Sequence, residues 1–168
     1  MEKLEKLKKM KIFSDFSDEE LKDVFRYTME KIFPSGNSIV RENRESPGLF
    51  LIVSGQVHVT KKIPSVVDSG SETLAMLGPG DHFGEMSLID GEPASASIVA
   101  SEPTICFAIK NNEYRKMIKE NPVIALKLYR FFTQALCERL RRTDSFLMEE
   151  LLKRKKAAFD KSLLAGSI

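Results

Sequence analysis

The spacing of apolar residues divides the chain into three zones, and the first, residues 1–28, predicts a helical segment. Ser17 and Glu20 stand three positions apart, as in a capping box, where the serine hydroxyl and the glutamate carboxylate bind N–H groups at a helix start. Leu21, Val24 and Phe25 follow at helical spacing. A helix is therefore expected to begin directly after Ser17.

The second zone, residues 29–110, has the short alternating runs of a β-domain. These runs occupy residues 39–40, 49–53, 57–60, 73–77, 96–100 and 104–109. Turn-forming residues separate them at 34–37, 46–48, 54–55, 68–70 and 78–80. Many short strands at this spacing predict a sandwich or barrel. Ser54 and Gly55, which lie between two apolar runs, predict a tight hairpin.

The third zone, residues 111–160, predicts helices, with a tail at 161–168. Asn111 is expected to cap a short helix that ends near residue 119, and Pro122 to be the first residue of a long one. Apolar positions on one face of the long helix are Tyr129, Phe132, Leu136, Leu140, Thr143, Leu147 and Leu151. This pattern favours a homodimer paired through the helix. A helix folded back on its own sheet explains the first half well, but it explains the apolar residues at 147–152 less well.

The composition is that of a soluble globular protein. The 168 residues are 42% hydrophobic and 30% charged, with a net charge of +2, which gives no reason to expect nucleic acid. No apolar run approaches the roughly 18 residues of a membrane span, and the N-terminus has no signal-peptide core, so a cytoplasmic protein is expected. Cys106 and Cys137 are expected to be buried reduced thiols.

The segment from residue 80 to residue 98 carries the chemistry. Gly84 permits a close backbone turn, and residues 85–89 are expected to form one helical turn whose free N–H groups face an anion. Ser95 and Ser97 add hydroxyls where the chain enters the next strand. The segment therefore predicts a phosphate cradle beside a carboxylate, that of Glu85, which is able to accept a hydrogen bond from a sugar hydroxyl.

This segment resembles the phosphate-binding cassette of the cyclic-nucleotide-binding family. The matching residues are Phe83, Gly84, Glu85, Leu88, Pro93, Ser95, Ala96, Ser97 and Ile98. Similar residues continue through 33–36, 49–55, 78–81 and 121–122, so the resemblance covers roughly residues 13–140. It implies a mainly β fold, an antiparallel, jelly-roll-like β-roll with N-terminal helices and a long C-terminal helix that acts as lid and dimer element.

The resemblance also implies roles for individual residues. Glu85 would accept a hydrogen bond from the ribose 2′-hydroxyl. The N–H groups around Ser87 and Ser95, with the Ser95 hydroxyl, would face the phosphate. Arg139 and Thr143 would approach the base from the long helix, which is expected to hinge near residues 143–145. The full set of expected ligand-binding residues is Phe83, Gly84, Glu85, Met86, Ser87, Leu88, Pro93, Ala94, Ser95, Ala96, Ser97, Arg139 and Thr143.

Ala94 departs from the family pattern, which has an arginine at this position. By resemblance, that arginine forms a forked, charge-assisted pair with the phosphate. Removing one partner of such a pair costs about 2–5 kcal/mol, on the order of 30-fold or more in affinity. Arg41, Arg44 and His82 are candidate replacements in the β-zone, although the favoured interpretation of each is an ordinary surface or strand residue.

Other functional classes fit the sequence less well. A metal enzyme needs clustered ligands, whereas His58 and His82 show no ligand spacing, so no catalytic residue, metal or cofactor is expected. A DNA reader is not expected either, because residues 160–168 are too few for a helix-turn-helix, and the basic run 153–156 is typical of a solvated helix end.

Two hypotheses remain. In the first, a regulatory sensor binds a cyclic nucleotide weakly, or another small anionic ligand, and signals to an unknown effector protein. In the second, a ligand-free module forms dimers and keeps a vestigial pocket. Glu85 favours the first hypothesis, because a solitary buried carboxylate is costly, and Ala94 favours the second.

Overall fold

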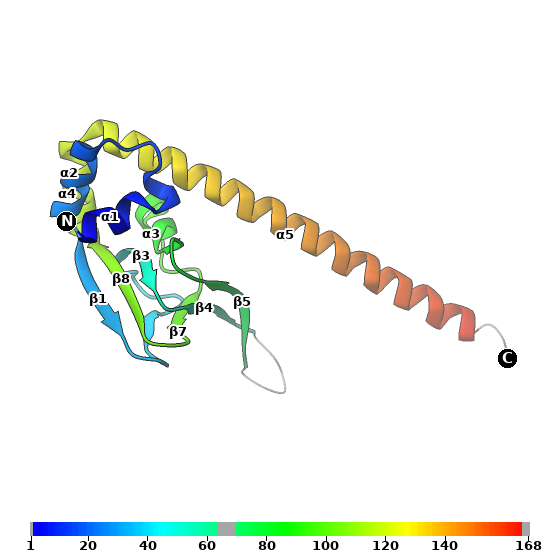
Figure 1. Cartoon of the computed structure of the whole chain (residues 1–168). Helices are drawn as coiled ribbons and strands as arrows, with labels where there is room; N and C mark the ends of the chain where they lie inside the picture. Colours follow the sequence, from blue (N-terminus) through cyan, green and yellow to red (C-terminus); the bar gives the residue numbers. More distant parts are fainter. Residues whose placement is uncertain (1, 64–69, 166–168) are drawn as a thin grey trace. The chain divides into compact units, whose positions relative to one another are not determined.

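The computed structural model describes residues 2–63 and 70–165 (Figure 1). The chain divides into two units, Met1–Leu128 and Tyr129–Ile168, and each is described by itself. The first unit contains the N-terminal helices, both β-sheets and the cassette segment. The second consists of the continuation of the last helix.

The N-terminal helices are α1 (Glu2–Lys8), a single 3-10 turn (Lys11–Phe13) and α2 (Asp18–Arg26). The capping box predicted at the start of α2 is confirmed. The Glu20 N–H donates to Ser17 Oγ at 3.2 Å, and the Ser17 N–H donates to Glu20 Oε2 at 2.6 Å. Leu21 and Val24 are buried on one face of the helix.

In the described residues, eight strands form two four-stranded antiparallel sheets, which agrees with the predicted β-roll. The strands are β1 (Met29–Phe33), β2 (Ser38–Val40), β3 (Gly48–Ser54), β4 (Val57–Lys62), β5 (Ser71–Leu77), β6 (His82–Phe83), β7 (Ser97–Ala100) and β8 (Thr104–Lys110). One sheet has the order β1-β8-β3-β6 and the other β2-β7-β4-β5. All six predicted strands are present. The sequence pattern had not singled out β1 and β6.

The core lies between the two sheets. Phe50, Ile52 and Cys106 of the first sheet share one buried cluster with Val57 and Ile98 of the second. Burial raises the pKa of the Cys106 thiol to about 12, so this cysteine is the buried thiol that was predicted. The same prediction was wrong for Cys137, whose side chain is exposed.

The hairpin predicted at Ser54 and Gly55 is wrong. β3 pairs with β6 and β8, whereas β4 pairs with β5 and β7, so this turn carries the chain from one sheet to the other. The turn packs against another connection between the sheets, the one from β7 to β8, since Thr104 Oγ1 donates to the Gln56 carbonyl at 3.1 Å. Gly55, at φ 84°, fits there because a Cβ would lie 2.5 Å from the Pro103 carbonyl oxygen.

Two helices follow the sheets: α4 (Asn111–Glu120) and α5 (Pro122–Ala165). Pro122 is the first residue of α5, as predicted. Asn111 was predicted to cap α4, but Lys110 holds the cap position and Asn111 is the first helical residue. The Asn111 side chain instead donates to the Ser46 carbonyl at 2.7 Å, a tertiary contact. In the described part of the chain, no helix is long and apolar enough to cross a membrane.

Candidate functional site: the cassette of residues 83–98

A glycine turn starts the site. β6 ends at Phe83, Gly84 takes a left-handed conformation (φ 90°), and the short helix α3 (Glu85–Asp90) follows. A Cβ at Gly84 would lie 2.1 Å from the Gly48 carbonyl oxygen, so a larger residue does not fit without movement of the backbone. The helical turn predicted for 85–89 is therefore present, and it extends to Asp90.

Glu85 is the first residue of α3, and only 2% of it is exposed. A carboxylate at the first turn of a helix is favoured by the positive end of the helix dipole. Burial of a charged group is costly unless other groups compensate it. The structure thus holds an acidic side chain inside the fold, beside the glycine turn, and its assignment to a ribose hydroxyl stays a prediction.

Ala94 lies on the second arm of the cassette, residues 93–97, and is buried. It belongs to the same apolar cluster as Val40, Phe83 and Ile98. Its backbone is hydrogen-bonded to a neighbouring turn: the Ala94 N–H donates to the Arg44 carbonyl, and the Asn43 N–H donates to the Ala94 carbonyl, both at 2.9 Å. Residues 41–44 therefore lie directly beside the position where the family pattern has arginine.

The serines of the cassette already take part in hydrogen bonds. Ser95 is exposed, and its hydroxyl donates to Met86 Sδ of α3 at 3.5 Å, which links the two arms of the cassette. Ser97 Oγ accepts the Glu42 N–H at 3.0 Å. The predicted role of Ser95 towards a phosphate needs only a rotation of an exposed hydroxyl, whereas Ser97 fastens the 41–44 turn.

The remaining predicted residues differ in burial. Met86 and Pro93 are exposed, while Ser87, Leu88 and Ala96 are partly buried, as is Gly84. Arg139 and Thr143 belong to the second unit, where both are exposed and Thr143 Oγ1 donates to the Arg139 carbonyl at 3.0 Å. Their approach to a bound base stays a prediction, as does the hinge at 143–145, which lies within α5.

The candidate cations differ in how accessible they are. Arg41 and Arg44 are exposed, whereas His82 is buried in β6 opposite Leu51 of β3. Within the described residues, no His, Cys, Asp or Glu side chains gather in a group of three that would hold a metal ion.

Sequence analysis missed the residues that support the cassette. Gly48 is one: a Cβ there would lie 2.1 Å from the Ile109 carbonyl oxygen, so β3 approaches β8 closely at the point where Gly84 also packs. Ser46 is another, fully buried where Asn111 binds its carbonyl. The Ser46-Pro47-Gly48 run was interpreted only as a turn, and nothing local in it indicated these contacts.

Comparison with known proteins gives matches across the chain. The model of the cyclic nucleotide-binding domain matches residues 30–121. The cyclic AMP receptor protein of Thermus thermophilus is 32% identical over 88% of this chain and 67% of its own length. The CRP-like cAMP-activated global transcriptional regulator of Mycobacterium tuberculosis is 30% identical over 70% of this chain. This chain spans only 49% of that regulator.

Solved structures agree. The crystal structure of a cyclic nucleotide-binding domain from Methylobacillus flagellatus superposes with a TM-score of 0.71 at 35% identity, covering 83% of this chain and 76% of that one. The Thermus thermophilus catabolite activator protein superposes with a TM-score of 0.68 at 32% identity, covering 79% of this chain and 61% of that one.

Proposed function

Since the chain belongs to the cyclic nucleotide-binding domain family, we propose that it is a non-catalytic regulatory domain whose cassette, residues 83–98, binds a cyclic nucleotide weakly or a related anionic ligand. The observation that carries this proposal is the preserved first arm of the cassette: the left-handed turn at Gly84, followed by the buried Glu85. By the family resemblance this glutamate accepts a hydrogen bond from the ribose 2′-hydroxyl, and in this chain it lies buried directly after the glycine turn.

Cyclic AMP is the first ligand to test. The relatives from Thermus thermophilus and Mycobacterium tuberculosis are named for it, and both are at least 30% identical to this chain. The Mycobacterium protein is named as a transcriptional regulator, but this chain spans only about half of it. We therefore propose the same ligand for this chain and do not propose that it regulates transcription. We expect a protein of the cytoplasm, where cyclic nucleotides act as signals, with an effector protein of unknown identity.

Weak binding follows from Ala94. In the absence of a cassette arginine, the phosphate loses a partner of the kind whose removal costs about 2–5 kcal/mol. At about 1.4 kcal/mol per tenfold, affinity falls on the order of 30-fold or more below that of a relative with the arginine. Dipoles of backbone N–H groups contribute only about 0.3–2 kcal/mol and do not replace it.

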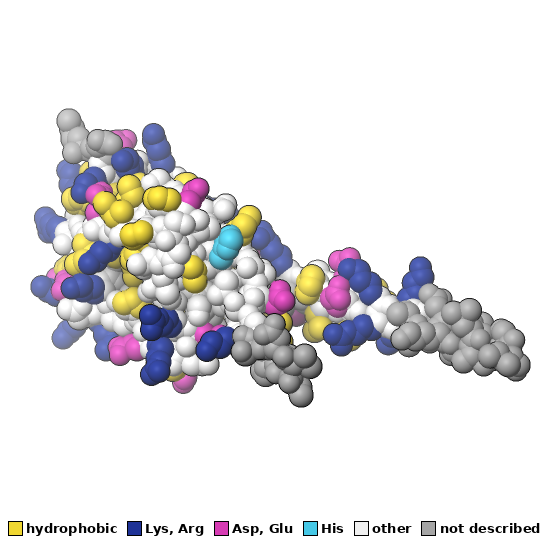
Figure 2. All heavy atoms as spheres, turned by 90° about the horizontal axis from the view of Figure 1, so that it is seen from below, with side chains coloured by type: hydrophobic (Ala, Val, Ile, Leu, Met, Phe, Trp, Pro, Cys, Tyr) yellow, Lys and Arg dark blue, Asp and Glu magenta, His cyan; other side chains and the backbone are white. Residues whose placement is uncertain are grey.

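We also propose that the second unit pairs with a second copy of this chain. Leu140, Leu147 and Leu151 are 43–61% exposed, and they lie within about 40° of one another around the helix. Figure 2 shows such apolar side chains among charged ones along this helix. The steps from Leu140 to Leu147 and from Leu147 to Leu151 are seven and four residues, the spacing of core positions in a coiled coil.

The dimer proposal is tested by Leu147→Lys, with Phe146→Lys as a matched control. Phe146 is also exposed but lies about 100° away around the helix. Sedimentation equilibrium is expected to give a monomer for Leu147→Lys and a dimer for both the wild type and Phe146→Lys. A monomeric wild type at tens of micromolar would overturn the proposal.

The second candidate function is a ligand-free dimerising module, and the packing of Ala94 in the apolar cluster favours it. Titration calorimetry with cyclic AMP, cyclic GMP and a cyclic dinucleotide separates the two candidates. The variant Ala94→Arg restores the cassette charge, and Ala75→Arg adds the same charge at an exposed position of β5. Binding that Ala94→Arg strengthens and Ala75→Arg leaves unchanged supports the sensor. If the wild type, Ala94→Arg and Ala75→Arg all show no binding heat, the result supports the ligand-free dimerising module.

A further inference from the structure

We infer that Arg44 supplies the positive charge that Ala94 lacks, so that a cation from the 41–44 turn, outside the cassette, holds the phosphate of the bound ligand. This inference rests on the proposed function of residues 83–98. It makes Arg44 an affinity-determining residue, and it names the side chain to which the anionic part of the ligand binds.

The placement of Arg44 follows from the backbone. The Ala94 N–H donates to the Arg44 carbonyl at 2.9 Å, so the two residues are joined by a direct hydrogen bond, although fifty positions separate them in the sequence. The Asn43 N–H donates back to the Ala94 carbonyl at the same distance. A side chain as long as that of arginine, attached at this point, is within reach of an anion seated beside residue 94.

The turn that carries Arg44 is held in place by several contacts. The Arg44 N–H donates to the Arg41 carbonyl at 3.2 Å, and Asn43 adopts a left-handed conformation at φ 58°. Glu42 is held at both its backbone and its carboxylate, since its N–H donates to Ser97 Oγ and its Oε2 accepts the Lys62 N–H, both at 3.0 Å. The backbone of the turn is therefore fixed against the second arm of the cassette, and the side chains of Arg41 and Arg44 are exposed on it.

The charge of Arg44 is available to a ligand. Its side chain is exposed, and among the described residues no carboxylate lies within ion-pair distance of the guanidinium. Arg41 is exposed too, but no hydrogen bond joins its backbone to Ala94, so it serves as the comparison residue. Because an exposed cation is screened by salt, this site is expected to bind more weakly as ionic strength rises.

The test is calorimetry with cyclic AMP on the whole chain at two salt concentrations. Arg44→Met is expected to weaken binding about tenfold, the effect of losing one charge-assisted hydrogen bond, whereas Arg41→Met is expected to change it less than twofold. Adenosine, which has no phosphate, is expected to show no difference between wild type and Arg44→Met. The double variant Arg44→Met with Ala94→Arg is expected to regain affinity, because the cation then comes from within the cassette.

The outcomes distinguish failure of the inference about Arg44 from failure of the proposed function. If wild type and Arg44→Met bind cyclic AMP equally, the inference is wrong and the proposed function stands. The same holds if wild type is silent but Ala94→Arg binds, since the cradle is then intact and Arg44 does not serve it. Silence of the wild type and of Ala94→Arg overturns both. Circular dichroism checks that each variant folds. Arg44→Met is expected to fold because Arg44 is exposed, whereas Ala94 is buried, so Ala94→Arg is compared only where its spectrum matches that of the wild type.

Discussion

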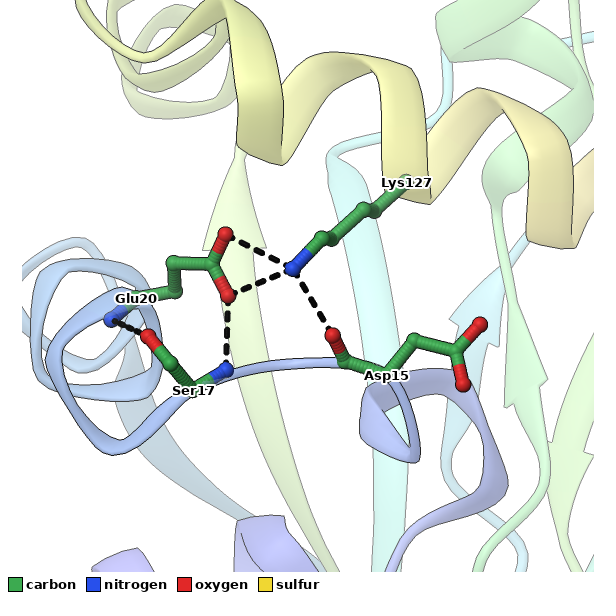
Figure 3. Close-up of polar contacts among 4 residues, drawn as sticks. All are labelled: Asp15, Ser17, Glu20 and Lys127. Atoms are coloured by element: carbon green, nitrogen blue, oxygen red, sulfur yellow. Dashed lines mark hydrogen bonds and ion pairs between the residues drawn. The ribbon is translucent and has the colours of Figure 1, made fainter.

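Lys127, in the second turn of α5, fastens that helix to the N-terminal segment, and its replacement by methionine is expected to destabilise the first unit. Its ammonium group lies 2.7 Å from each carboxylate oxygen of Glu20 and 2.7 Å from the Asp15 carbonyl (Figure 3). It also lies 5.3 Å from the centre of the Phe16 ring. Methionine keeps the apolar stem and removes only the charge and its hydrogen bonds.

The size of the expected loss of stability follows from the partial burial of the ion pair between Lys127 and Glu20. The side chains of Lys127 and Glu20 are 29% and 19% exposed, so the pair lies between a surface ion pair, worth about 0–1 kcal/mol, and a buried one, whose breaking costs about 3–5 kcal/mol. Hydrogen bonds to charged groups contribute about 1.5–3 kcal/mol. A loss of about 2 kcal/mol in the free energy of unfolding is expected at neutral pH.

The dependence on pH gives a second readout. The Lys127 ammonium, and then the backbone N–H of Ser17, hold the pKa of the Glu20 carboxyl below its usual value. A carboxyl group whose pKa is lowered by folding stabilises the fold at pH values above the pKa that it has in the unfolded chain, about 4.5. This contribution is lost as the pH falls through the lower pKa of the folded state. Below pH 4.5 the wild type is therefore expected to lose stability more steeply than Lys127→Met.

Urea unfolding followed by circular dichroism at pH 7 and pH 3.5 measures both effects. Lys3→Met is the control, because Lys3 forms a more exposed pair with Glu30 at 3.2 Å and its loss should cost less than about 0.5 kcal/mol. Equal stability of Lys127→Met and wild type at pH 7, or a gap between them that does not narrow at pH 3.5, would refute the reasoning.

Two further predictions concern the glycine turn and the thiols. Gly84→Ala is expected to lower the free energy of unfolding by about 2 kcal/mol or more and to weaken ligand binding. Gly91→Ala is the control, because Gly91 has a similar φ of 75° but a Cβ there would meet nothing within 4 Å, so only the smaller cost of the backbone conformation is expected. Equal losses of stability in urea unfolding would contradict the close contact between Gly84 and Gly48. Cys137 is expected to react with a thiol reagent in the native protein at pH 8, whereas Cys106, with its pKa near 12, should react only after unfolding. One rapid equivalent in native protein and two in urea is the expected count.

The features that the sequence predicted well are those with local causes. Ser17 and Glu20 are three residues apart, and the interaction between them needs no distant partner. Pro122 restricts its own backbone and so marks a helix start wherever the rest of the chain lies. The cassette is equally local, since Gly84 and Glu85 define its first arm within two positions.

The predictions that failed depended on partners far along the chain. Ser54 and Gly55 have the composition of a hairpin turn, but the strands they join find their partners in different sheets, which no local pattern specifies. Asn111 is a favourable helix cap by type, yet its amide binds the Ser46 carbonyl, 65 residues away. In both cases tertiary hydrogen bonds override a correct local preference.

The cassette, too, combines features that are local in the sequence with contacts between distant residues, and these contacts affect how a ligand would be bound. A motif aligned by sequence assigns the phosphate cation to position 94 and finds alanine there. In the fold, position 94 is one side of a hydrogen-bonded junction whose other side is Arg44. A ligand interacts with the charges near it in space, whatever their order in the sequence, so the loss of one cassette residue can be compensated from the facing turn if that turn is rigid. The contacts of Glu42 with Ser97 and with the Lys62 N–H provide that rigidity.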